Sequence, residues 1–224
     1  MIDSLKTYIK NNEVDKIMDM LTQNPEILDK NDENGSSGLL IIAYSGLQLA
    51  FTKAKELRKS YSFHEAIVCG KIDDVKYSLM QDKTVVNKFS NDGFTPLSLA
   101  AFFNQTAIAK LLLKNGADPN LAATNASKVN ALHSAIAKEN YELCKLLLEQ
   151  GAKVNSTQMQ NVTALHSAAH RGNLKMVQLL VDNGAEINLK MDNGDTAISI
   201  AERENHKEIK DYLEGVQDKG HPQN

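Results

Sequence analysis

The sequence has no tryptophan, and among its 224 residues it has only two cysteines, four prolines and 5 % aromatic side chains. Two cysteines, Cys69 and Cys144, are too few for a disulfide framework, so a reducing compartment is expected. The formal charge of −3 gives no general attraction to nucleic acid or anionic membrane, because both favour basic surfaces. Sparse aromatics with abundant Leu and Ala favour short helices over a β-sandwich.

Long apolar runs are also missing. The longest, LLIIA at 39–43, is far shorter than the roughly 20 residues of a membrane-spanning helix. The amino terminus, MIDSLKTYIKNNEVDK, lacks the apolar stretch and cleavage pattern of a signal peptide. We therefore expect a cytoplasmic monomer whose partners include neither nucleic acid nor membrane.

What the sequence does contain is a repeat. ALHSA occurs at 131–135 and again at 164–168, and the match extends over 130–155 and 163–188 to a final Asn. A third copy covers 95–120, a fourth begins at 196, and weaker copies lie at 4–24, 37–57 and 62–81. The equivalent apolar residue falls at Leu5, Leu39, Phe63, Leu97, Leu132, Leu165 and Ile198, with spacings of 34, 24, 34, 35, 33 and 33. Such a period predicts a solenoid, in which each unit buries its apolar face against its neighbours.

Each unit is expected to form helix, turn, helix and loop. Thr95, Asn130, Thr163 and Thr196 are predicted N-caps. Left-handed turns are predicted at Gly46, Gly70 and Gly172, and at Asn12, Asn104 and Asn205. The second helices carry an apolar stripe at i, i+3 and i+4, for example Leu143, Leu146 and Leu147.

GFTPLSLAA (93–101), ALHSAAHRG (164–172) and LLVDNGAEIN (179–188) closely resemble the ankyrin repeat. The resemblance is specific over about 93–213 and degenerate over 1–92. It implies an all-α ankyrin-repeat solenoid of about seven stacked helix-turn-helix units joined by short projecting turns. It also implies a curved surface that typically binds other proteins, so we expect an adaptor, scaffold or inhibitor.

The expected organisation is a single ankyrin-repeat domain over 1–215 and a disordered tail at 216–224. Within the domain, units 1–92 are degenerate, units 93–190 are regular, and 191–215 is a terminal cap with a charged outer face. The short spacing between Leu39 and Phe63 leaves no room for the usual turn, so the helix at 46–60 should run nearly straight into the next unit.

The sequence offers little chemistry. His166 and His170 have metal-ligand spacing, but His166 occupies the histidine position of the repeat, as do His133 and His64, where the resemblance implies a bond within the turn. Cys144 is expected in the core and Cys69 near the inner surface. No catalytic, cofactor or metal site is predicted, since the familiar motifs are missing. The alternative is a small-molecule- or metal-dependent enzyme or sensor, marked by a deep pocket with two or more titratable groups.

The predicted partner-binding surface consists of variable residues at the projecting turns and at the carboxyl ends of the first helices. Aromatic and Arg residues at such rigid, exposed places are typical of binding hot spots. In one hypothesis an apolar centre of phenylalanines is flanked by cations, and in the other Phe102 and Phe103 pack against neighbouring units. The candidate residues are Phe94, Phe102, Phe103, Lys138, His170, Arg171 and Arg203.

Overall fold

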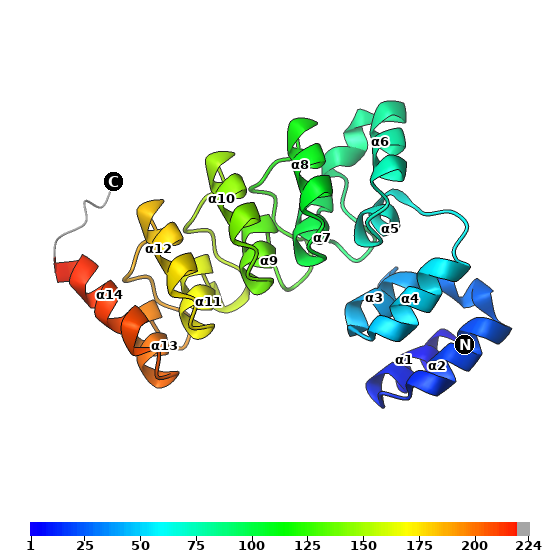
Figure 1. The fold of residues 1–224 in the computed structure, drawn as a ribbon, viewed down its shortest axis with the longest axis horizontal. Helices are drawn as coiled ribbons and strands as arrows, with labels where there is room; N and C mark the ends of the chain where they lie inside the picture. The colour runs from blue at the N-terminus through cyan, green and yellow to red at the C-terminus, as the bar shows by residue number, and fades with distance from the viewer. Residues whose placement is uncertain (219–224) are drawn as a thin grey trace. The chain divides into compact units, whose positions relative to one another are not determined.

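The computed structural model describes residues 1–218, which form seven pairs of helices, shown in Figure 1. In chain order the pairs are α1 (Ile2–Lys10) and α2 (Val14–Gln23), α3 (Gly38–Ser45) and α4 (Gln48–Leu57), α5 (Phe63–Val68) and α6 (Ile72–Gln81), α7 (Pro96–Phe102) and α8 (Thr106–Lys114), α9 (Ala131–Ala137) and α10 (Tyr141–Glu149), α11 (Ala164–His170) and α12 (Leu174–Asp182), and α13 (Ala197–Arg203) and α14 (Lys207–Asp218). Short 3-10 helices lie at Pro25–Asp29, Lys83–Asn87 and Met159–Asn161. The predicted all-α stack of helix-turn-helix units is confirmed.

The first helices begin where the cap residues predict. Thr95, Asn130, Thr163 and Thr196 each accept a hydrogen bond from the backbone N–H three residues on, within a capping box. After the first helix the chain turns through a left-handed residue, with φ 59° at Asn104 and 71° at Gly172. Local chemistry therefore fixes both ends of these helices.

The chain divides into two compact units. The amino-terminal unit contains 1–85 and 89–93, and the carboxy-terminal unit contains 86–88 and the chain from 94 onward. This division lies close to the expected change from degenerate to regular repeats at 92/93. In the amino-terminal unit, α2 packs against α4 and α1 against α3. They enclose a core that includes Leu5, Leu21, Leu39 and Ile42.

The third repeat begins one residue later than expected from the comparison of the repeats in the sequence. Ser62 is the N-cap of α5, 25 residues after the N-cap Ser37 and 33 residues before Thr95. His64 therefore takes the position of Leu97, and Glu65 takes the expected histidine position. The alignment of Phe63 and His64 was wrong by this one residue. Residues 58–62 join α4 to α5, because α4 ends at Leu57, earlier than expected.

Glu65 connects this short repeat to the one before it. Its buried carboxylate accepts hydrogen bonds from Ser37 Oγ (2.7 Å), the Ser62 backbone N–H (2.9 Å) and Arg58 Nη2 (3.0 Å). Burial raises the pKa of Glu65, but these donors outweigh it and the net pKa is lowered. A buried carboxylate is thereby kept charged and paired.

The projecting turn of the second repeat contacts the turn at 89–93. Asp92 accepts hydrogen bonds from Tyr44 OH at 2.9 Å and Ser36 Oγ at 3.0 Å. A Cβ added to Gly35 would lie only 2.6 Å from Asn91 Cβ, so the two turns are in close contact. The third repeat has no turn of its own between them.

An asparagine ladder holds the repeats of the carboxy-terminal unit together. The Asn that ends each repeat donates to a glycine carbonyl of the next repeat and accepts the backbone N–H two residues further on. The distances are 3.1 and 2.9 Å for Asn87, 3.0 and 2.8 Å for Asn120, and 3.1 and 2.9 Å for Asn155. Asn188, in the last position, accepts from Gln217 of α14 at 2.9 Å.

The helix α14 ends the described chain. It buries Ile209 and Leu213 and continues to Asp218, so 216–218 are helical although the sequence suggested a tail from 216. Residues 219–224 of the expected tail lie outside the described residues. Exposed Glu202 and Arg203 on α13 agree with the expected charged outer face.

We expect Asn155→Ala to lower the free energy of unfolding by about 1–2 kcal/mol, because its three side-chain hydrogen bonds to the next repeat, with Gly184 O, Glu186 Oε1 and the Glu186 N–H, are lost. Urea unfolding followed by circular dichroism measures this change. Asn183→Ala is the control, since the Asn183 side-chain amide donates to Leu179 O within the same repeat. Equal losses in the two variants would show that the inter-repeat bonds contribute nothing special.

Candidate protein-interaction surface

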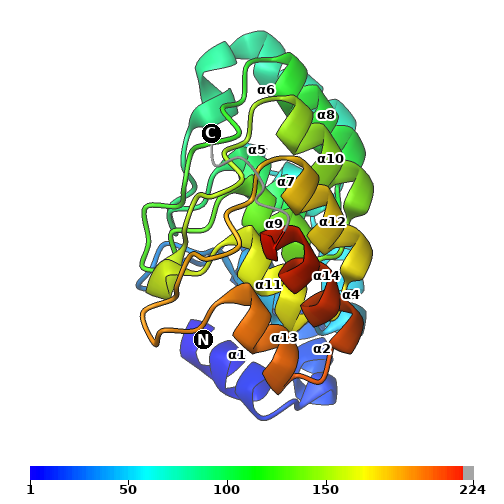
Figure 2. The same cartoon turned by 90° about the vertical axis from the view of Figure 1, so that its left-hand side faces the viewer.

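The carboxyl ends of the first helices form a row in the carboxy-terminal unit. Helices α7, α9, α11 and α13 pack on one another in chain order (Figures 1 and 2). Each ends in a pair of residues that are exposed or only partly buried. We call these pairs the helix-end row: Phe102–Phe103, Ala137–Lys138, His170–Arg171 and Arg203–Glu204.

Two phenylalanines and a lysine begin the helix-end row. Phe102 is 36 % exposed, and its ring meets the half-buried Phe103 edge-on, with centroids 5.3 Å apart and planes at 78°. Lys138 Nζ, from the next repeat, lies 4.2 Å from the centroid of the Phe102 ring. A cation over an aromatic face is attracted by the ring quadrupole, which holds both side chains in place.

The basic side chains further along the row lie beside carboxylates. Arg171 Nη1 lies 3.8 Å from Glu139 Oε1, and His170 Nδ1 lies 3.4 Å from Glu204 Oε1. Arg203 pairs with Glu204 at 3.2 Å and with Asp195. Exposed pairs like these contribute little to stability. They do place an acidic group beside each of these basic side chains, which lowers the net positive charge that the basic residues alone suggest for this surface.

Six of the seven predicted site residues lie in the helix-end row, and Phe94 does not. Phe94 is half-buried and precedes the opposite end of α7, roughly 10 Å away along the axis of this seven-residue helix. Sequence reasoning missed Glu139, which pairs with Arg171 from the preceding repeat. The sequence carries one weak signal for Glu139. It stands where the other repeats have Gly or Asn in the left-handed turn, and it has φ 54°.

The repeat histidines are structural. His166 Nδ1 accepts the Thr163 backbone N–H at 3.0 Å, and its Nε2 lies 3.0 Å from Leu189 O. His133 makes the same pair of contacts, with Asn130 N–H and Ser156 O. Both ring nitrogens of His166 are therefore engaged, as the resemblance implied. Within residues 1–218, no group of three or more His, Cys, Asp and Glu side chains is arranged for a metal ion.

Both cysteines are shielded from solvent. Cys144 is buried in α10, and Cys69 is half-buried against the core of the amino-terminal unit. Burial raises the pKa of each thiol to about 12, so both stay protonated at neutral pH.

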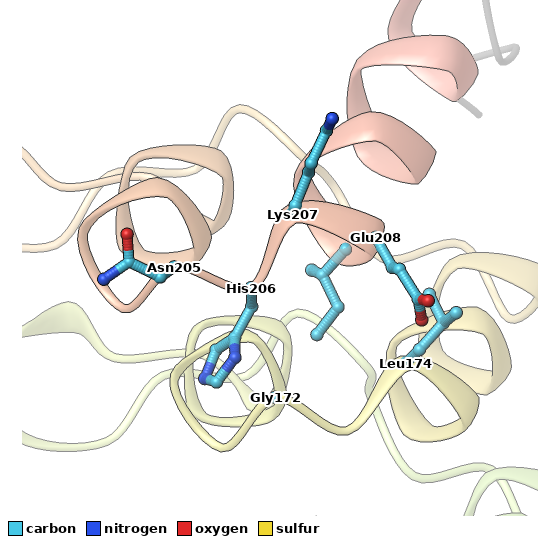
Figure 3. Close-up of a pocket in the computed structure, with 7 residues that line it drawn as sticks. Gly172, Leu174, Asn205, His206, Lys207 and Glu208 are labelled. Carbon is cyan, nitrogen blue, oxygen red and sulfur yellow. The ribbon is translucent and has the colours of Figure 1, made fainter.

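A hollow of about 300 Å³ lies where α14 begins, beside the turn after α11. Figure 3 shows the His206 ring directed at Gly172, and Lys207 pointing away from it. His206 Nε2 lies 3.2 Å from His170 O, so this imidazole joins two repeats. Three titratable residues line this hollow, His206, Lys207 and Glu208, and the side chains of Lys207 and Glu208 are exposed.

The stacked helix pairs, projecting turns and inter-repeat ladder define a helical solenoid. The family model for ankyrin repeats (3 copies) matches residues 5–122, 63–158 and 132–219. The chain belongs to the ankyrin repeat family.

Curated relatives share parts of this sequence. The chain is 35 % identical over 75 residues to human DNA-binding protein RFXANK, covering 34 % of this chain and 29 % of that protein. It is 37 % identical over 100 residues to rat ankyrin repeat and SAM domain-containing protein 6, covering 45 % and 11 %. It is 38 % identical over 65 residues to human ankyrin repeat family A protein 2, covering 29 % and 20 %. The chain thus spans less than a third of each of these relatives.

The family is generally a protein-binding module and is typically non-catalytic. None of the helices in residues 1–218 combines the length and apolar character needed to cross a membrane.

We expect the free energy of unfolding to fall as the pH is lowered from about 6.5 to about 4, in part because of His133. Burial lowers the pKa of His133 to about 4, below the roughly 6.5 of an unfolded histidine. In this window the unfolded chain binds a proton that the folded chain excludes. The loss from this residue reaches about 1.4 kcal/mol per pH unit.

His133→Ser tests this assignment, since Ser98 and Ser199 fill the same capping position in other repeats. The difference in urea stability between neutral pH and about pH 5 should shrink in this variant. Part of the pH dependence should remain in this variant, because burial also lowers the pKa of His166. An unchanged pH dependence would contradict the assignment.

Gly172→Ala should destabilise the protein more than Gly46→Ala, measured by thermal unfolding. Both glycines follow a first helix, with φ 71° and 74°, so both variants incur roughly 1–2 kcal/mol of left-handed strain. Only at Gly172 would the new Cβ clash, 2.6 Å from His206 Cε1, whereas Gly46 has nothing within 4 Å. Similar losses would mean that His206 moves aside freely.

Proposed function

We propose that this chain is a protein-interaction module, acting as a cytoplasmic, monomeric adaptor, scaffold or inhibitor. It binds a partner protein through the helix-end row and the projecting turns. The observation that carries the proposal is the exposed Phe102 ring, fixed between Phe103 and Lys138 on a packed helix. An aromatic side chain held at a rigid, exposed place is typical of a binding anchor.

The row supports binding because it is ordered before a partner arrives. Arg171, His170 and Arg203 each contact a carboxylate within the row or the adjoining turn. Side chains already held in one orientation lose less entropy on association. The pairing also leaves an almost neutral surface, which favours recognition by shape and apolar contact over attraction of a charged partner.

The double variant Phe102→Ala/Lys138→Ala tests the proposal. We expect it to lose partner affinity by about tenfold or more, equal to about 1.4 kcal/mol, with little change in melting temperature. The assay cross-links tagged protein in native lysate and quantifies each captured protein by mass spectrometry.

Tyr141→Ala/Lys175→Ala is the matched control. Lys175 Nζ lies 4.1 Å over the Tyr141 ring, so this pair is the same inter-repeat contact placed on the second helices. Partners should be captured by wild type and control and lost by the test variant. Equal capture by all three proteins would refute a role for the helix-end row.

A further inference from the structure

Two projecting turns carry side chains where other repeats use glycine. The residue two positions before the N-cap is left-handed in every repeat that has a turn: φ is 80° at Gly35, 86° at Gly93 and 87° at Gly194. The fifth and sixth repeats place Lys128 (φ 52°) and Asn161 (φ 55°) there. Gln160, the neighbour of Asn161, is also left-handed, with φ 63°.

A left-handed backbone is unfavourable for a side chain such as Lys or Gln, whereas glycine adopts it freely. Strained residues of this kind persist where the surroundings fix them, and they concentrate at functional sites. Lys128 and Gln160 are both exposed, so packing in the core does not require either side chain.

Backbone hydrogen bonds hold these turns beside each other. The Met159 N–H donates to Ser127 O at 3.0 Å, which places Met159 next to Lys128. The Asp192 N–H of the following turn donates to Gln160 O at 3.1 Å. Met159 is 53 % exposed, and the Lys128 ammonium makes no ion pair with any residue from 1 to 218. A cation, a large apolar side chain and an amide are thus exposed on two neighbouring turns that a backbone hydrogen bond joins; we call Lys128, Met159 and Gln160 the loop platform.

We propose that the loop platform is a recognition site for an extended peptide segment of the partner that carries an acidic residue beside a large apolar residue. The inference rests on the proposed function, and names the chemistry of the partner at its projecting turns. The acidic residue complements the charge of Lys128, which has no ion pair within residues 1–218. The apolar residue packs on Met159, whose flexible thioether adapts to varied shapes. In this site the exposed amide of Gln160 bonds the peptide backbone.

A random-sequence peptide library displayed on phage supplies the probe. It is selected on the wild-type protein after depletion on the Lys128→Gly/Met159→Ala variant, which removes peptides that bind elsewhere. The surviving peptides should place Asp or Glu beside Leu, Met or Phe. Their affinity should fall about tenfold or more in Lys128→Gly and in Met159→Ala, whereas Lys128→Arg should bind as wild type does. The melting temperature of Lys128→Gly should equal or exceed that of wild type, because the strain is relieved.

The outcomes separate this inference from the proposed function. The inference is overturned if depletion on the Lys128→Gly/Met159→Ala variant removes every binding peptide, or if the surviving peptides lack acidic residues. If those peptides then lose binding to Phe102→Ala/Lys138→Ala, the proposed function stands while this inference fails. A library with no enrichment on wild type counts against both. A lower melting temperature in Lys128→Gly would show that Lys128 is retained for stability, and would also overturn the inference.

Discussion

The two hydrogen bonds between the Asn that ends one repeat and the backbone of the next are the contacts on which the carboxy-terminal unit depends. In a solenoid each unit contacts only its neighbours, so nothing distant corrects an error in stacking. A side-chain amide that both donates and accepts fixes distance and orientation together. With the register fixed at Asn87, Asn120 and Asn155, contacts such as Lys138 over Phe102 recur in a defined geometry.

The third residue of the first helix is not the same in every repeat, and its hydrogen-bond partners differ accordingly. In α9 and α11 it holds a neutral histidine, which bonds the N-cap and a carbonyl of the following turn. In α5 the residue is Glu65, and its bonds run backward to Ser37 and Arg58. Arg58 of the connecting segment is mostly buried and pairs with this acid at 3.0 Å, which helps the carboxylate to remain charged there. These bonds join the third repeat to the second repeat.

Sequence reasoning succeeded where the cause is local. Caps, left-handed turns and apolar stripes depend on residues within one turn of a helix, and those predictions are confirmed. The predicted register of the third repeat was wrong by one residue, because Phe63 resembles the large apolar residue that recurs in the first helix of each repeat. The S-x-x-E signal of Ser62 and Glu65 was present and gives the correct register. The pairing of Arg171 with Glu139, and the unequal exposure of Phe102 and Phe103, depend on neighbouring repeats and have no local pattern.

The helix-end row and the loop platform lie at opposite ends of the first helices. Nine residues, 129–137, lie between Lys128 and Lys138, and the seven of them that form α9 span roughly 10 Å along the helix axis. An extended chain covers that distance in about three residues. One short segment of a partner can therefore reach both regions across a single repeat. It would meet the Lys128 ammonium at the turn, which is unpaired within the described chain, and the Phe102 ring at the helix end, where Lys138 lies over that ring.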